Sequence, residues 1–197
     1  MLLCNDDTEI VIEGFPRSAN TFSVVAFMQA QSSPVKVAHH LHVEAQLMYA
    51  AKRGIPAIAL IRTPEDSFRS LLIRHPESAP DWMIARYIKF YAAVRKLGDK
   101  CLVVKYEDVI GDMGGIISRI NSHFGTKFDV PVHDETMVKS VFKEIEAINQ
   151  RIYQGKESHI GRPSEERKQL AKEIDFSGLE AEISKANALY ESMTSAC

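Results

Sequence analysis

The chain has 197 residues, of which 45% are hydrophobic and 25% are charged, a composition typical of a soluble globular protein with one domain and a sizeable core. Its formal net charge of −2 excludes a basic surface of the kind that binds nucleic acid without sequence preference. No apolar run approaches the length of a membrane span, and the three cysteines are too widely spaced for a disulfide framework or a metal site. We therefore expect a single cytoplasmic domain, residues 1–197, that binds neither nucleic acid nor metal.

Short apolar runs alternate with longer segments of helical periodicity. This pattern predicts an α/β fold with three layers, in which a mainly parallel central sheet has helices on both faces. The predicted strands are 9–12, 35–39, 57–61 and 101–105. The predicted helices are a run from residue 23, 43–53, a helix that starts at Pro64, a helix from Pro80 to near Gly98, 114–124, 135–153, 164–174 and 179–193. Residues 164–197 are expected to pack on the rest of the domain.

The segment 13–22 joins the first predicted strand to the first predicted helix. A tight turn between a strand and a helix is suited to binding an anion, because the first N–H groups of the helix have no partners and the helix dipole is positive there. Arg17 adds a positive charge to this turn. Ser18, Asn20 and Thr21 add side-chain hydrogen-bond donors. We therefore predict a cradle for phosphate or sulfate.

This loop differs from the Walker A loop of ordinary ATP- and GTP-binding proteins. Ala19 stands at the position of the second glycine, and Asn20 stands at the position of the lysine. The alternative to an anion site is a plain strand-to-helix connection, in which Asn20 or Ser18 only caps the helix. That alternative requires neither Arg17 nor so many polar groups, so we favour the anion site.

Residues suited to catalysis or binding also follow the other three strands. They are the histidines His39, His40 and His42, then Arg62, and then segment 106–108 with its two acids. The carboxyl ends of parallel strands meet at one edge of the sheet, where α/β proteins bind their ligands. We therefore expect the anion loop, the histidines and the arginine to share one site.

Four segments resemble, in matching order, the motifs of a known enzyme family. Residues 14–22 resemble a 5′-phosphosulfate loop, and residues 58–70 resemble a 3′-phosphate segment in which an arginine ends a strand and a serine follows eight positions later. Residues 38–42 resemble a Lys-Thr-His-Leu-Pro stretch that holds a catalytic histidine, and residues 103–108 resemble a Tyr-Glu-Asp strand end. Over residues 8–125 the chain therefore resembles the sulfotransferases that use 3′-phosphoadenosine 5′-phosphosulfate (PAPS), and in particular compact, bacterial-type members.

The resemblance implies a P-loop-like sulfotransferase fold and an enzyme that moves a sulfuryl group from the co-substrate PAPS to a hydroxyl or amine of a small-molecule or glycan acceptor. The nucleotide product is then 3′-phosphoadenosine 5′-phosphate (PAP), and no metal is implied. The resemblance assigns His40 as the general base and Arg17 as the group that stabilises the leaving phosphate. The residues that it assigns to nucleotide binding are Arg17, Ser18, Ala19, Asn20, Thr21, Phe22, Arg62 and Ser70, with Lys156, Gly161 and Arg162 as candidates in a C-terminal loop, 154–163.

The histidines and the arginine also have structural interpretations. Three histidines in four positions suit an exposed polar turn or a metal site as well as catalysis. His39 and His42 are less favoured than their neighbour as the base, because successive residues at a strand end should point apart. Arg62 is able to pair with Glu65 or Asp66 instead of with a phosphate.

Other segments leave two interpretations open. Phe22 suits adenine stacking or the core of its helix, segment 106–108 suits a helix cap, and segment 154–163 suits a charged loop without a ligand. The acceptor site is either open or formed by the helices after Pro80. The aromatic residues there suit a small-molecule pocket or the helix core, and they are Trp82, Tyr87, Phe90 and Tyr91.

Two other functions compete with sulfuryl transfer. A small P-loop kinase or NTPase requires a lysine in the loop and an acidic Mg²⁺ ligand at a strand end, and this loop has no lysine. A non-catalytic nucleotide-binding protein requires only the anion site. The sequence identifies neither the acceptor nor the oligomeric state.

Overall fold

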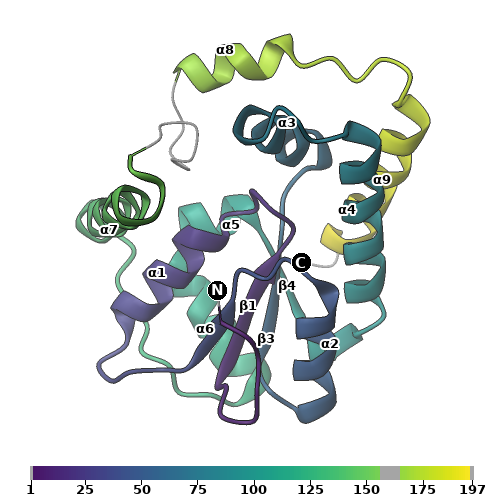
Figure 1. Ribbon diagram of the computed structural model, residues 1–197. Helices are drawn as coiled ribbons and strands as arrows, with labels where there is room; N and C mark the ends of the chain where they lie inside the picture. The colour runs from purple at the N-terminus through teal and green to yellow at the C-terminus, as the bar shows by residue number, and fades with distance from the viewer. Residues whose placement is uncertain (1, 156–164, 196–197) are drawn as a thin grey trace.

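The computed structural model describes residues 2–155 and 165–195, and Figure 1 shows how they are arranged. In these residues a four-stranded sheet forms the centre, with the strand order β2-β1-β3-β4. All neighbouring strands are parallel, and Ile12 is paired with His39 on one side and with Ile58 on the other. The strands are β1 (Ile10–Gly14), β2 (Val37–His39), β3 (Ala57–Ile61) and β4 (Leu102–Lys105).

Helices cover both faces of this sheet, so the fold is the three-layer α/β structure that the sequence predicts (Figure 1). One face carries α1 (Asn20–Ala30), α5 (Tyr106–Gly111), α6 (Met113–Phe124) and α7 (Glu135–Tyr153). The other face carries α2 (Glu44–Arg53), α3 (Pro64–Arg74), α4 (Pro80–Arg95) and α9 (Glu180–Thr194). The remaining described helix, α8 (Glu165–Glu173), packs on α3. Within the described residues, no helix is both long enough and apolar enough to span a bilayer.

The two central strands, β1 and β3, are buried on both faces, and their sequences are therefore almost continuously apolar. Alternate residues of a strand point to opposite faces. Val11 and Ala59 accordingly belong to the core beneath α2, α4 and α9, whereas Ile12 and Leu60 belong to the core beneath α1, α6 and α7. Each face of the sheet thus has its own hydrophobic core.

The aromatic residues of α4 show which interpretation of that helix is correct. Tyr87, Phe90 and Tyr91 are at most 1% exposed and belong to the core, whereas Trp82 is 59% exposed. The helix-core interpretation therefore holds for three of these four residues. Their rings pack against the sheet and against one another, with 4.5 Å between the ring centres of Tyr87 and Tyr91.

The chain leaves the two central strands in opposite directions. After β1 it runs through α1 to β2 on one side, and after β3 it runs through α3 and α4 to β4 on the other side. Open α/β sheets bind ligands at the carboxyl ends of the strands where the order reverses in this way. The loops that follow β1 and β3 meet at this edge, so the fold brings the predicted anion loop and Arg62 together.

The described elements agree with the predicted ones to within a few residues, but one helix was not predicted. Strand 57–61 and helix 135–153 have the predicted bounds, and α1 begins at Asn20 instead of residue 23. The unpredicted helix is α5, which follows β4 directly. It has six residues, too few for helical periodicity to be visible in the sequence.

Candidate functional site

The loop between β1 and α1, which is predicted to bind an anion, has an unusual backbone. Arg17 and Ala19 both adopt left-handed conformations, with φ of 73° and 65°. Such conformations cost free energy in residues other than glycine, and strained residues of this kind tend to cluster at functional sites. Ala19 is the N-cap of α1, and no side chain caps the helix. The interpretation in which Ser18 or Asn20 caps α1 is therefore wrong, and the first N–H groups of the helix keep their capacity for a ligand.

The left-handed conformation of Ala19 leads to a prediction. Glycine adopts this conformation without the steric cost that alanine has, so we expect Ala19→Gly to stabilise the protein by about 0.5–1 kcal/mol. For a chain of this length that corresponds to a rise in Tm of roughly 2 °C, which differential scanning fluorimetry resolves. Ala92→Gly, within the regular helix α4, is the matched control and should lower Tm. A lower Tm for Ala19→Gly would contradict the assigned strain.

Asn20 and Ser18 hold the loop together instead of presenting donors to a ligand. Asn20 Nδ2 donates to the carbonyl oxygen of Phe15 at 3.0 Å. Ser18 is 0% exposed, and its Oγ lies 3.5 Å from the hydroxyl of Tyr91. The Tyr91 hydroxyl donates to the carbonyl of Leu60 at 2.6 Å. Both side chains are buried and turn toward the protein, and the assignment of Ser18 and Asn20 to nucleotide binding stays a prediction.

Arg17 is bonded to the segment that follows β3. Its Nε donates to Ser70 Oγ at 2.9 Å, and its carbonyl oxygen accepts a hydrogen bond from Arg62 Nη1 at 3.3 Å. The guanidinium of Arg62 also lies over the ring of Tyr106, 4.4 Å from its centre, and 4.0 Å from a carboxylate oxygen of Asp66. The two segments predicted to bind the two ends of a nucleotide therefore contact each other.

The Nε of Arg62 is a charged donor that is not used within the described residues. This atom is buried and has no hydrogen-bond partner among the described residues. Burying a charged donor without a partner is costly, and an anion that accepts from it removes that cost. The ion pair with Asp66 that the sequence allowed does exist, but at 4.0 Å it does not engage Nε.

Two arginines that were not predicted from the sequence, Arg74 and Arg167, add to the positive charge around Arg17. Burial lowers the pKa of Arg17 to about 9, and three neighbouring guanidinium groups, those of Arg167, Arg74 and Arg62, lower it further. Arg74 lies four positions after Ser70 on α3, so helical periodicity could have identified it. Arg167 lies on α8, which has no motif. A described site with four guanidinium groups suits a ligand with several negative charges.

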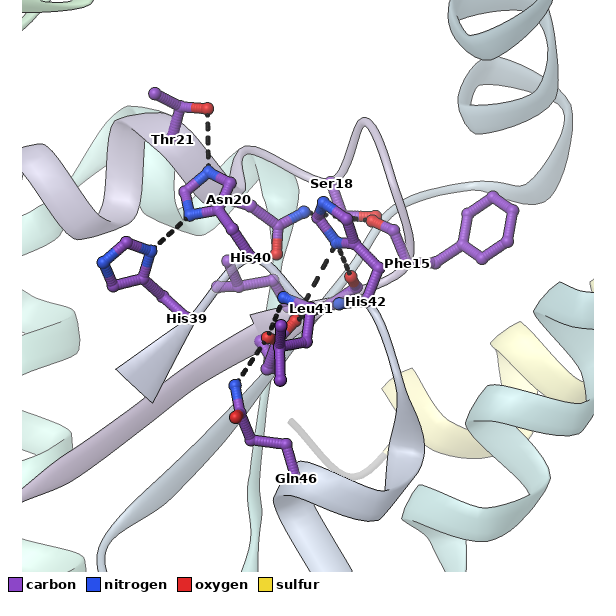
Figure 2. A network of polar contacts seen from close by, with 12 residues as sticks. Phe15, Ser18, Asn20, Thr21, His39, His40, Leu41, His42 and Gln46 are labelled. Carbon is purple, nitrogen blue, oxygen red and sulfur yellow. Dashed lines mark hydrogen bonds and ion pairs between the residues drawn. The ribbon is translucent and has the colours of Figure 1, made fainter. Parts of the chain in front are cut away.

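The three histidines after β2 lie together (Figure 2). His40 Nε2 is 3.0 Å from Thr21 Oγ1, and His40 Nδ1 is 2.7 Å from His39 Nδ1. The ring centres of His40 and His42 are 5.7 Å apart. The expectation that neighbours point apart is wrong, because His40 and His42 have left-handed backbones, with φ of 63° and 55°, and so do not continue the strand.

Burial keeps these histidines uncharged at neutral pH. It lowers the pKa of His40 to about 3, and the charges that His39 and His42 can carry lower it further. Burial also lowers the pKa of His39 to about 4. A neutral imidazole has one nitrogen that accepts a proton, which is the state that a general base requires.

Glu13 is a functional candidate that the sequence analysis missed. It is 0% exposed, although it lies in the apolar strand β1, and a lone acid in such a run was the available signal. Its carboxylate accepts hydrogen bonds from the backbone N–H groups of Leu41 at 2.7 Å and His42 at 3.1 Å, and from Gln46 Nε2 at 2.8 Å. Burial raises the pKa of Glu13 to about 7, although these bonds act in the other direction. Glu13 thus holds the backbone of the turn that carries the histidines.

The remaining predicted residues are placed as follows. Phe22 is 4% exposed and packs on Phe142, with ring centres 5.6 Å apart, which favours its interpretation as helix core. The candidates Lys156, Gly161 and Arg162 lie outside the described residues. Among the residues that are described, no group of three or more histidine, cysteine, aspartate or glutamate side chains is arranged to hold a metal ion.

Comparison with known proteins bears on the fold. No protein-family model and no curated protein matches the sequence. Among solved structures, the chain is similar to a mouse sulfotransferase, SULT7A1, in a crystal structure of its complex with PAP. The two share 13% sequence identity, and the match covers 94% of this chain and 91% of the mouse chain, with a TM-score of 0.51. The α/β structure with its parallel central sheet therefore has the sulfotransferase fold.

Proposed function

We propose that this protein is a sulfotransferase that uses PAPS and transfers its sulfuryl group to a hydroxyl or amine of a small-molecule or glycan acceptor. The observation that carries the proposal is the hydrogen bond between Arg17 Nε and Ser70 Oγ at 2.9 Å, because it joins the loop after β1 to the segment after β3. A nucleotide with phosphate groups at both its 5′ and 3′ positions requires two such anion-binding segments in one site. The resemblance to compact, bacterial-type members remains a prediction.

The described residues fit such a nucleotide. The uncapped N-terminus of α1 offers backbone donors, and the buried Nε of Arg62 offers an unused charged donor. PAPS supplies an activated sulfuryl group whose leaving group is a phosphate. Arg17 then stabilises the negative charge that develops on the leaving oxygen. The resemblance assigns His40 as the base that takes the acceptor proton.

Nucleotide selectivity is the first test of this proposal. We expect PAP at about 100 times its Kd to stabilise the protein by about 2.7 kcal/mol, which corresponds to a rise in Tm of roughly 5–10 °C. ATP with Mg²⁺ should give a smaller shift, because the loop lacks the Walker A lysine. Differential scanning fluorimetry measures both shifts.

Two arginine variants sharpen that measurement. Arg62→Ala should lose most of the PAP shift, because it removes a charge-assisted contact. Arg53→Ala is the matched control, since Arg53 is exposed and, among the described residues, pairs with surface groups of α2 and the N-terminal segment. A larger shift with ATP and Mg²⁺ would overturn the proposal in favour of a kinase or NTPase. A PAP shift without turnover of PAPS on any acceptor would indicate a non-catalytic nucleotide-binding protein.

A further inference from the structure

The two histidines that close the turn after β2 differ in how their ring nitrogens are used. Both nitrogens of His40 are engaged, Nε2 with Thr21 Oγ1 at 3.0 Å and Nδ1 with His39 Nδ1 at 2.7 Å. A neutral imidazole has one lone pair to offer, and both of its nitrogens are already in contacts here. Figure 2 shows His40 between Thr21 and His39. For His40 to take a proton from an acceptor, one of these contacts has to break first.

His42 has one nitrogen fixed and the other available. Its Nδ1 lies 2.8 Å from the carbonyl oxygen of Gly14. A carbonyl oxygen only accepts hydrogen bonds, so Nδ1 carries the hydrogen and the lone pair lies on Nε2. Among the described residues, Nε2 of His42 makes no hydrogen bond. The side chain is 29% exposed, so this lone pair remains accessible to a substrate.

A buried carboxylate holds His42 in this orientation. Glu13 Oε2 lies 3.8 Å from His42 Nδ1 and accepts the backbone N–H of His42 at 3.1 Å. Gln46 donates to the same carboxylate, and its Oε1 accepts the backbone N–H of Cys4 at 2.9 Å. Both the backbone and the ring of His42 are therefore fixed by groups with little exposure to water. A base oriented by a third group is the arrangement that activates proton transfer in many enzymes.

The surroundings of His42 place it at the anion site. Burial lowers the pKa of His42, and the positive charges of Arg74 and Arg17 lower it further. His42 thus lies within electrostatic reach of the arginine proposed to stabilise the leaving group. A bound anion offsets these positive charges, which raises the pKa of His42 toward the range suited to a base.

We infer that His42 is the general base, acting through Nε2, and that Glu13 is the positioning residue that orients it. The inference rests on the proposed function and changes which histidine takes the proton. Nε2 accepts the proton as the O–H or N–H bond of the acceptor breaks and the acceptor atom bonds to sulfur. The bond from sulfur to the 5′-phosphate oxygen breaks in the same transfer, and its electron pair goes to that oxygen, next to Arg17.

Asparagine at either histidine position gives a matched pair of variants. Of the residues other than glycine, asparagine tolerates the left-handed backbone of both sites best. In His42→Asn the amide Nδ2 occupies the place of Nδ1 and keeps the hydrogen bond to Gly14, whereas the basic nitrogen is lost. We expect His42→Asn to lower kcat by about 100-fold or more, with the Kd of PAP and the Tm close to those of the wild type. His40→Asn should lower kcat less.

The comparison of the two variants decides the inference. If His40→Asn lowers kcat as much as His42→Asn or more, the assignment is overturned. If His42→Asn turns over PAPS at the wild-type rate, its role is only to hold the loop, and the assignment is likewise overturned. Glu13→Gln tests the positioning residue, and we expect it to lower kcat and to leave the KM for PAPS nearly unchanged.

A second measurement needs no acceptor and so does not depend on turnover. Diethyl pyrocarbonate acylates the free lone-pair nitrogen of a neutral histidine, and mass spectrometry locates the product. We expect His42 to react before His40, because Nε2 of His42 makes no hydrogen bond in the described residues, whereas both ring nitrogens of His40 are in contacts. Faster reaction at His40 would overturn the inference. A failure of the proposed function is seen separately, in the comparison of PAP with ATP and Mg²⁺.

Discussion

Arg17→Ala is expected to lower kcat for sulfuryl transfer by about 100- to 1000-fold. This is the effect of removing one group that stabilises developing negative charge in a site shielded from water. Arg17 remains positively charged at neutral pH even though its pKa is lowered to about 9. Steady-state kinetics with labelled PAPS measures the change.

The stability of the same variant separates this catalytic role from a structural one. The folded state disfavours the charge of Arg17, as the direction of its pKa shift shows, so alanine relieves repulsion and should not lower Tm. Arg17→Lys keeps a charge but loses the planar geometry, and it should retain more activity than the alanine variant. A fall in kcat of less than about threefold for Arg17→Ala would remove Arg17 from the proposed role.

Gly14→Ala is expected to destabilise the protein by about 3 kcal/mol, which lowers Tm by roughly 6–12 °C. A Cβ at this position would lie 2.5 Å from the carbonyl oxygen of Leu60 and 2.9 Å from its Cβ. Those atoms belong to the neighbouring strand β3 and cannot move independently of the sheet. Thermal unfolding followed by circular dichroism measures the loss.

A second glycine provides the control for this prediction. A Cβ at Gly111, at the end of α5, would meet no atom within 4 Å, and its backbone is not left-handed. Gly111→Ala should therefore be neutral or slightly stabilising. Equal losses in the two variants would show that the close approach of β1 to β3 at Gly14 is not what limits the size of this residue.

The sequence was sufficient to predict the sheet and to predict that the segments after β1 and β3 lie together. The apolar runs at 57–61 and 101–105 have the length of strands, and the order of strands and helices requires a parallel sheet. Once the strands are parallel, the residues after β1 and β3 must meet at one edge. The contact between Arg17 and Ser70 follows from that geometry.

Three features of the site could not be derived from sequence pattern. The strand rule of alternating side chains failed at His40 and His42 because their backbones are left-handed, a conformation that histidine rarely adopts and that no local motif indicates. Ser18 appeared to be a donor to the ligand, but the hydroxyl of Tyr91, 73 positions away, turns it inward. Arg167 enters the site only through tertiary packing of α8.

The bond between Arg17 and Ser70 has a consequence for how ligands are recognised. Because this bond joins the two segments proposed to bind anions, and because Arg62 donates to the backbone of Arg17, the segments cannot respond independently to what they bind. Residues in direct contact typically show coupling energies of about 0.5–3 kcal/mol. Fragments that occupy only one end of the site, such as adenosine 3′-phosphate or pyrophosphate, should therefore have binding free energies whose sum differs from that of the whole nucleotide. An inhibitor assembled from such fragments would need to be optimised as one molecule.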